Sequence, residues 1–242
     1  MQNKENWNTS WSVDQQNNPP QNLDYEVLEL FPTPVYTSVM PSELSGIIPF
    51  LNAQTPNTGS DIANYGERSS NSYILNEPEC KEVKKYVLEH IKEYAENILL
   101  YDYKTWELSQ SWVSRKHPGQ HHTMHTHPNS LISGVFYYGE PEKETPAIKF
   151  HKMVGGINQQ VIQPAIKPDK RSSKFAWKEF SINFAPGLLL LFPSYLFHSV
   201  PLNEGKIVRS SVAFNVVPKT RLGSEENLTE LRFDKIFNAK TK

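Results

Sequence analysis

Cysteine is almost absent from this 242-residue chain, which contains only Cys80. A lone cysteine excludes an internal disulfide and any zinc site built on cysteine pairs. No apolar run approaches the roughly 18 residues that a membrane-spanning helix needs. An excess of one charge is also lacking, because 25 Lys and Arg against 26 Asp and Glu give a formal net charge of −1. We therefore expect no membrane association, and binding to nucleic acid is not favoured.

The first residues, Met1 to Trp7, lack the apolar core of a signal peptide, so we expect a cytoplasmic protein. Glycine is scarcer than proline, with 11 residues against 18. This balance favours fixed loops and short strands over a helical bundle. An apolar content of 38% is sufficient for the core of a globular protein.

Composition changes divide the chain into three predicted segments. Residues 1–24 are rich in Asn and Gln without an apolar period, which is typical of a disordered tail. Residues 25–220 are predicted to form a single domain, with an irregular polar insertion at about 139–178. Residues 221–242 are predicted to be a polar C-terminal extension.

One long helix is predicted at about residues 77–100. Val83, Val87 and Ile91 begin an apolar face with helical spacing, and Asn76 is placed to cap the first turn. A brief strand is predicted just before it, at Ser72–Leu75.

The rest of the chain favours strands over helices. Apolar runs of strand length are separated by Pro, Gly and polar residues, which is typical of an all-β sandwich or barrel. The predicted strands are Leu108–Arg115, Leu131–Tyr138, Ala147–Phe150, Glu179–Asn183, Leu188–Phe192 and Ile207–Val217.

Histidines are concentrated in one stretch, with five of the eight lying between His117 and His127. Residues i and i+2 of an extended segment point the same way, so His125 and His127 can offer two imidazoles to one metal ion. His198, just after the apolar Leu188–Phe192 run, is a candidate third ligand. Three protein ligands leave coordination positions open, as a catalytic metal site requires.

An arginine follows the third histidine on a predicted strand. Arg209, Ser211, Ala213 and Asn215 alternate with Ser210, Val212 and Phe214 and therefore share one face. A buried guanidinium needs a partner, and a carboxylate matches it through paired hydrogen bonds. The interpretation is an anion site, and the alternative is an Arg paired with a nearby Asp or Glu.

These motifs together resemble the iron(II)- and 2-oxoglutarate-dependent oxygenases. The resemblance extends over about residues 28–217 and is strongest to a group of bacteria and marine phages with an HxHP…SGVYY block. Prolyl hydroxylases are more distant. It depends on His125-x-His127-Pro, Ser133-Gly-Val-Phe-Tyr-Tyr138, His198-x-Val-Pro and Arg209-x-Ser211. It implies a mainly β fold, a double-stranded β-helix (a cupin-like jelly roll) with flanking helices.

The resemblance also implies site roles. His125 and His198 would be iron ligands, and His127 stands where the family often has Asp or Glu. Arg209 would bind the distal carboxylate of 2-oxoglutarate with help from Tyr137 and Ser211. Asn215 would face the iron side of the pocket.

A histidine at position 127 leaves the metal one charge more positive than a carboxylate would. His127 is therefore either a third ligand or a loose one, His121 or His122 could compete, and another divalent metal could be preferred. We expect His121 and His122 to be loop residues or to lie behind the ligands.

Three functional hypotheses follow. The first is an Fe(II)/2-oxoglutarate-dependent dioxygenase that uses O2, hydroxylates a C–H bond and releases succinate and CO2. The second is a three-histidine, cupin-like dioxygenase that needs no 2-oxoglutarate. The third is a non-catalytic jelly roll that binds a partner. A protein side chain or a small molecule is the expected substrate, and the sequence leaves the oligomeric state open.

Overall fold

The computed structural model describes residues 28–29, 31–57, 66–152 and 177–232. The chain divides into two compact units, residues 1–33 and residues 34–242. The described helices and strands all belong to the second unit. The predicted tail and most of the predicted insertion lie outside the described residues. Within the described part, no helix is both long enough and apolar enough to cross a membrane.

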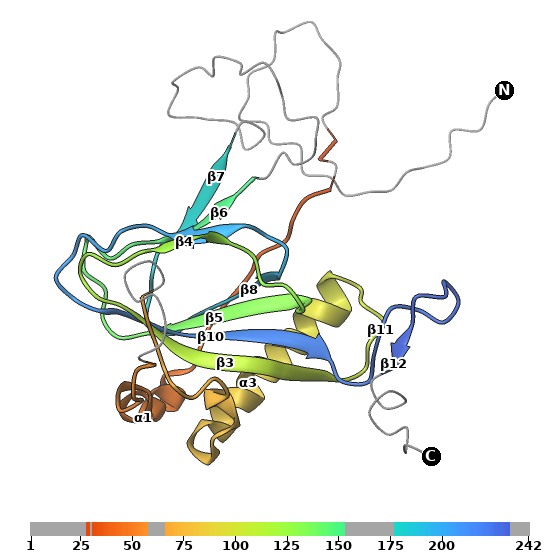
Figure 1. The fold of residues 1–242 in the computed structure, drawn as a ribbon, viewed down its shortest axis with the longest axis horizontal. Helices are drawn as coiled ribbons and strands as arrows, with labels where there is room; N and C mark the ends of the chain where they lie inside the picture. Colours follow the sequence, from red (N-terminus) through yellow and green to blue (C-terminus); the bar gives the residue numbers. More distant parts are fainter. Residues whose placement is uncertain (1–27, 30, 58–65, 153–176, 233–242) are drawn as a thin grey trace, which may run out of the picture. The chain divides into compact units, whose positions relative to one another are not determined.

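A six-stranded antiparallel sheet forms the centre of the second unit (Figure 1). Its two longest strands, β3 and β10, are neighbours and pair along almost their whole length. In spatial order the strands are β1 Tyr36–Val39, β8 Leu188–Pro193, β5 Ile132–Tyr138, β10 Arg209–Pro218, β3 Trp106–Lys116 and β2 Glu67–Arg68.

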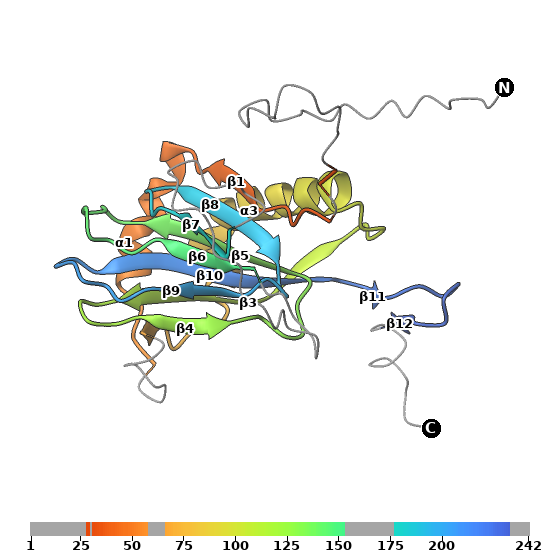
Figure 2. The same cartoon turned by 90° about the horizontal axis from the view of Figure 1, so that it is seen from above.

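A smaller antiparallel sheet faces the large one (Figures 1 and 2). Its strands, in spatial order, are β4 His122–His125, β9 His198–Val200, β6 Ile148–His151 and β7 Glu179–Ile182. In both sheets strands that are far apart in the sequence pair with each other, such as β1 with β8 and β4 with β9, as in a jelly roll. A separate two-stranded pair, β11 Arg221–Leu222 and β12 Leu231–Arg232, follows the jelly roll.

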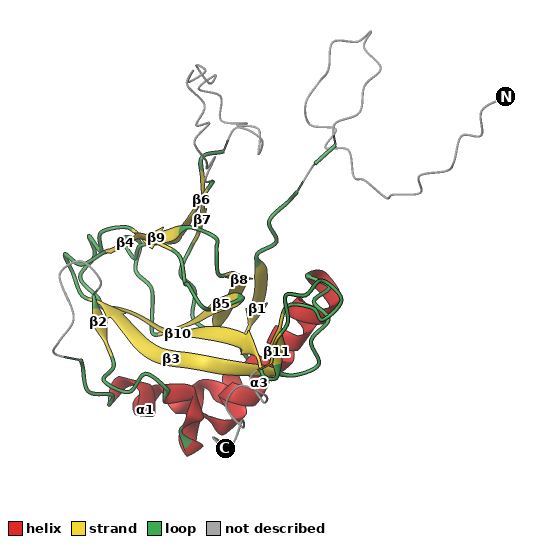
Figure 3. Ribbon diagram, turned by 45° about the vertical axis from the view of Figure 1, so that its right-hand side comes forward, coloured by secondary structure: helices red, strands yellow, loops and turns green. Residues whose placement is uncertain are grey.

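Helices cover the face of the large sheet that is turned away from the small sheet (Figure 3). The longest is α3, Lys81–Lys92, which packs Val83, Val87 and Ile91 into the core. It is preceded by the 3-10 turn η3, Pro78–Cys80, and continues as the π-helix η4, Glu93–Ile98. The other helical segments are η1 Ser42–Ile47, α1 Ile48–Asn52 and η2 Ile74–Asn76.

The alternation of side chains along β5 creates two cores. Phe136 and Tyr138 join the cluster that includes the α3 side chains. Val135 and Tyr137 point the other way and join Phe150 of the small sheet in a second cluster. Because successive strand residues face opposite sides, one strand serves both the helix-covered core and the space between the sheets.

The mainly β architecture predicted from the sequence is confirmed. Each of the six strands predicted after the long helix coincides with an observed strand, with ends that differ by no more than two residues. The predicted helix at about 77–100 is also confirmed, as a continuous helical course from Pro78 to Ile98. The domain boundaries stay a prediction.

The predicted cap at Asn76 is wrong. Asn76 ends the 3-10 helix η2, and its side-chain oxygen accepts a hydrogen bond from Lys84 Nζ at 2.7 Å. The α-helix begins only after the 3-10 turn at Pro78–Cys80. The Asn76 side chain therefore pairs with Lys84 instead of capping the helix, and the 3-10 turn at Pro78–Cys80 leads into the α-helix.

The strand predicted at Ser72–Leu75 is also wrong. Tyr73 makes only an isolated bridge to Ser111, and the chain then turns into η2. The hydroxyl of Ser111 accepts a hydrogen bond from the Leu75 N–H at 3.0 Å. This contact joins residues that are far apart in the sequence, so the local pattern could not predict it. It stabilises the turn.

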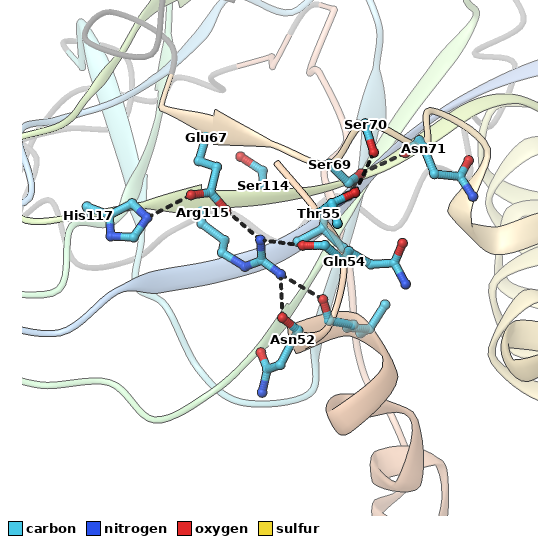
Figure 4. A network of polar contacts seen from close by, with 12 residues as sticks. Asn52, Gln54, Thr55, Glu67, Ser69, Ser70, Asn71, Ser114, Arg115 and His117 are labelled. Carbon is cyan, nitrogen blue, oxygen red and sulfur yellow. Dashed lines mark hydrogen bonds and ion pairs between the residues drawn. The ribbon is translucent and has the colours of Figure 1, made fainter. Parts of the chain in front are cut away.

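Arg115 fastens α1 to the edge of the large sheet (Figure 4). Its guanidinium donates to the backbone oxygens of Leu51, Asn52 and Gln54 at 2.8, 3.0 and 3.1 Å. It also pairs with Glu67 of β2 at 2.5 Å. Arg115 therefore satisfies carbonyls that the end of a helix leaves without partners, and it does so on the helix-covered side of β3.

Gly134 of β5 leaves room for a core aromatic ring. A Cβ atom at this position would overlap the ring of Phe214 on the neighbouring strand β10. We predict that Gly134→Ala lowers the free energy of unfolding by about 1–3 kcal/mol, because it overpacks a buried site. Urea unfolding measures this change.

Gly46 is the matched control, because a Cβ there would meet nothing within 4 Å. Gly46→Ala should change the free energy of unfolding by less than about 0.5 kcal/mol or raise it slightly. Equal destabilisation by the two substitutions would contradict the packing role of Gly134.

Candidate metal centre and active site

Three histidines converge between the two sheets. His125 ends β4, His127 lies two residues beyond that strand, and His198 begins the neighbouring strand β9. One ring nitrogen from each lies within 4.8 Å of the other two. The structure therefore brings together the three histidines that the sequence analysis singled out. Among the described residues, this is the group of His, Cys, Asp and Glu side chains able to hold a metal ion.

Backbone carbonyls orient two of the three rings. The Nδ1 atom of His125 lies 2.8 Å from the carbonyl oxygen of Thr123. The Nδ1 atom of His198 lies 2.9 Å from the carbonyl oxygen of Leu196. A carbonyl can only accept, so each Nδ1 carries the proton and each Nε2 keeps its lone pair for a metal.

His127 is the third member of the group and lies beside His198. Its Nε2 lies 3.2 Å from the Nε2 of His198, close to the separation of about 3 Å between neighbouring ligands of one metal ion. The Asn215 side chain hydrogen-bonds His127, and the Trp112 ring stacks on it with centroids 6.1 Å apart. These contacts fix a side chain that the strand itself does not hold.

The electrostatic environment keeps the three imidazoles neutral. Burial lowers the pKa of His198 to about 3 and the pKa of His127 to about 4, with His125 adding to both shifts. Burial also lowers the pKa of His125, although its hydrogen bond to the Thr123 carbonyl opposes the shift. Neutral imidazoles are the form that binds a metal.

The donor set fits a divalent transition metal. Three neutral imidazoles, two of them with the tautomer set by a carbonyl, suit Fe(II), and they also suit Zn(II), Co(II) and Ni(II). The donors come from one end of the small sheet, so the remaining coordination positions face the cavity between the sheets. Such a partly open centre suits catalysis better than a purely structural role.

The cavity beyond the histidines leads to Arg209 and Tyr137. Arg209 is 3% exposed and donates from Nη2 to the Tyr137 hydroxyl at 3.0 Å and from Nε to the Pro146 carbonyl at 3.0 Å. Its guanidinium carbon lies 4.8 Å from the centre of the Tyr137 ring. The guanidinium is thus held rigidly, and among the described residues no carboxylate pairs with it.

The other predicted cosubstrate residues lie on the expected face. Ser211 is buried, lines the cavity and donates a long 3.5 Å hydrogen bond to the Ser114 carbonyl. Asn215 contacts His127 and accepts from the Ser133 hydroxyl at 3.4 Å. The predicted face of the Arg209 strand is therefore present, and the roles of these residues stay predictions.

His121 and His122 behave differently from each other. His121 precedes β4, while His122 begins it and stacks on His125 with ring centroids 4.0 Å apart. His122 also lines the cavity. It lies next to the three-histidine group without being part of it, which agrees with the expectation of a residue behind the ligands.

Sequence reasoning missed two cavity residues on β3, Trp112 and Lys116. The strand was predicted, and its period of two puts Trp112, Ser114 and Lys116 on one face. This periodicity could have identified the three residues as one face of the strand. The sequence did not reveal which strands lie opposite β3, so it could not show that this face is turned toward the histidines.

The fold and the metal-capable centre can be compared with those of known proteins. Residues 110–215, which run from β3 to β10, match a family model described as "Putative 2OG-Fe(II) oxygenase". The matched segment contains all three histidines and Arg209. The match, the jelly-roll fold and the histidine centre support an enzyme of the 2-oxoglutarate- and iron(II)-dependent oxygenase class. No curated protein matches the chain.

Solved structures share the fold. An oxidoreductase of the 2OG-Fe(II) oxygenase family from Burkholderia pseudomallei is 10% identical, with a TM-score of 0.52 and coverage of 76% of this chain and 84% of that chain. A Pseudomonas putida prolyl-4-hydroxylase is 11% identical, with a TM-score of 0.51 and coverage of 76% and 92%. HygX from Streptomyces hygroscopicus is 11% identical, with a TM-score of 0.54 and coverage of 77% and 84%.

The lowered pKa values predict metal binding that resists acid. An imidazole with the ordinary pKa of about 6.5 loses ~10-fold of its neutral form between pH 7.5 and 5.5, so three such ligands would lose ~1,000-fold in affinity. Because the pKa values of His127 and His198 are lowered to about 4 and about 3, these rings stay neutral at pH 5.5. We expect the Co(II) dissociation constant to rise less than about 10-fold over this range.

Titration of metal-free protein with Co(II) at the two pH values measures the effect. His198→Ala should weaken Co(II) binding at both values. A ~1,000-fold loss at pH 5.5 in the unsubstituted protein would show that the rings titrate as exposed imidazoles do.

Proposed function

We propose that this protein is an Fe(II)- and 2-oxoglutarate-dependent oxygenase that hydroxylates a C–H bond and releases succinate and CO2. One observation supports the proposal above the others. Three oriented imidazole nitrogens and a buried, rigidly held arginine line the same cavity between the sheets. A metal centre and a carboxylate site are thus within one enclosed space, as a chelating keto acid with a distal carboxylate requires.

Iron with 2-oxoglutarate and O2 supplies the oxidising chemistry when bound, and the chain's residues hold and orient it. In the proposal His125, His127 and His198 hold the metal through Nε2. The Nδ1 hydrogen bonds to Thr123 and Leu196 keep two of the rings from turning. His198 is buried and the other two rings are partly buried, which would limit the access of water to a metal held by them.

Arg209 and Tyr137 are proposed to hold the distal carboxylate. Arg209 uses Nε and one Nη2 proton in hydrogen bonds to described residues, and its other N–H groups are proposed to donate to the carboxylate. Burial raises the pKa of Tyr137, so its hydroxyl keeps its proton and can donate it to an oxygen of the carboxylate. Ser211 and Asn215 are proposed to assist on the same face of β10.

The histidine at position 127, in place of a carboxylate, favours one alternative function. A centre of three histidines also suits a dioxygenase that needs no 2-oxoglutarate, in which Arg209 would bind the substrate's own carboxylate. Production of succinate distinguishes the two functions. A jelly roll that only binds a partner would produce no succinate and would not require a metal.

The substrate is proposed to be a protein side chain or a small molecule. Proteins of similar fold include a prolyl-4-hydroxylase and HygX, whose structure contains nickel, 2-oxoglutarate and hygromycin B. The fold therefore accepts very different substrates and does not choose between them. The closer resemblance to the bacterial and marine phage group, and the cytoplasmic location, stay predictions.

We predict a metal-to-ligand charge-transfer band when Fe(II) and then 2-oxoglutarate are added to metal-free protein without oxygen. His198→Ala should abolish the band because it removes a ligand that Leu196 holds in place. His90→Ala is the matched control, since His90 contacts Tyr36 and is not part of the three-histidine group. Visible difference spectra measure both outcomes. Iron binding without a band would favour the alternative dioxygenase.

Arg209→Ala separates the two halves of the proposed site. Loss of a charge-assisted contact to a carboxylate should weaken 2-oxoglutarate binding by about 10- to 100-fold. Iron affinity should stay within about 3-fold of its original value, because Arg209 contacts no proposed iron ligand. Titrations of Fe(II) and of 2-oxoglutarate measure the two affinities separately. Equal losses in both would argue against a carboxylate-binding role for Arg209.

A further inference from the structure

Lys116 is a buried lysine beside Arg209. It ends β3 and lies in register with Arg209 of the neighbouring strand β10. Lys116 is 1% exposed and Arg209 is 3% exposed, and both side chains line the cavity that holds the histidines. Two cationic side chains are thus enclosed together at one end of that cavity.

Neither cation has an anionic partner among the described residues. The Nζ atom of Lys116 contacts the Ser114 hydroxyl at 2.7 Å, its one hydrogen bond in that part of the chain. Glu67, on the adjacent strand β2, turns instead to Arg115 and His117, as Figure 4 shows. Its two carboxylate oxygens lie 2.5 and 3.1 Å from their nitrogens. No Asp or Glu lines the cavity within the described residues.

The surroundings of Lys116 are strongly unfavourable to its charge. Burial, together with the nearby charges of Arg209 and Arg68, lowers the pKa of Lys116 to about 7. The protein nevertheless provides room for this side chain. Gly66 takes a positive φ of 68° beside it, and a Cβ atom there would overlap the Lys116 side chain. A buried amine that destabilises the fold, but for which the neighbouring glycine leaves room, is a candidate for ligand binding.

We propose that Lys116 and Arg209 form a two-cation subsite that binds the distal carboxylate of 2-oxoglutarate. This inference rests on the proposed function and adds a cosubstrate-binding residue to it. The two cations lie on paired strands, so the amine and the guanidinium can contact different oxygens of one carboxylate. The hydroxyls of Tyr137 and Ser211 lie on the same inner faces and complete the subsite.

A subsite of this kind makes the distal carboxylate the main selectivity determinant. Two buried cations that have no counter-ion among the described residues strongly favour an anionic group and disfavour an apolar one. The cavity should therefore distinguish 2-oxoglutarate from 2-oxovalerate, which has the same five-carbon chain but a methyl group in place of the distal carboxylate.

Lys116→Met tests the proposal, because methionine keeps the length of the apolar stem and removes the charge. Lys149→Met is the matched control, since Lys149 is 33% exposed and already pairs with Glu179 at 2.6 Å. Dissociation constants of both keto acids are measured with Fe(II)-loaded protein, without oxygen, from the charge-transfer band or by calorimetry.

Lys116→Met should weaken 2-oxoglutarate binding by about 10- to 100-fold and change 2-oxovalerate binding by less than about 3-fold. Lys149→Met should change neither. Unchanged binding of 2-oxoglutarate by Lys116→Met, or equal losses for the two keto acids, overturns the proposal.

Thermal unfolding of the metal-free variants gives a readout that a merely structural lysine would not give. Removing a buried cation that has no anionic partner in the described part of the chain should raise the unfolding temperature by at least about 2 °C. A lower unfolding temperature together with weakened binding would mean that Lys116 stabilises the fold, and the proposal would be wrong.

Titration of metal-free protein with glutarate distinguishes this inference from the proposed function. Glutarate carries the distal carboxylate but lacks the keto group that chelates iron. Glutarate binding that Lys116→Met abolishes supports the subsite even if the charge-transfer band is absent, in which case the oxygenase proposal alone fails. If 2-oxoglutarate gives the band and Lys116→Met does not weaken its binding, the oxygenase proposal is supported and the Lys116 subsite is wrong.

Discussion

The site depends on the register between β10 and its two neighbours. Pairing of Arg209 with Lys116, and of Ser211 with Tyr137 and Ser114, brings polar residues of three strands to one face of the large sheet. A shift of β10 by one residue would turn Arg209 and Ser211 to the helix-covered side, away from Lys116 and Tyr137. Apolar residues of β10 on the other face, including Val212 and Phe214, hold the register because they are completely buried under the helices.

Arg115 and Lys116 show how differently the two faces of this sheet are used. On the helix side Arg115 reaches three carbonyl oxygens and a carboxylate, so its charge stabilises the contact between α1 and the sheet. On the cavity side Lys116 contacts one hydroxyl. The first face contributes to stability, and the second keeps an arrangement that opposes it, as binding sites commonly do.

The sequence was sufficient for the fold class, the main strands, the long helix and the meeting of the three histidines. Strong apolar periods mark these elements, and paired motifs mark the histidines. It was insufficient for Lys116 and Trp112, because their importance depends on which strand lies opposite β3. It was also misleading at Asn76 and at Ser72–Leu75, where Lys84 and Ser111 supply contacts from elsewhere in the chain.

The charge balance of the cavity connects its two ends. A centre of three neutral histidines leaves a divalent metal with its full charge, and Lys116 and Arg209 add positive charge at the far end. Within the described residues the cavity lining supplies no carboxylate to offset either. A dianion that spans both ends would relieve both excesses at once, whereas a neutral or singly charged ligand would leave one uncompensated. Binding of the metal and of a dicarboxylate should therefore favour each other, since each reduces the electrostatic cost of the other.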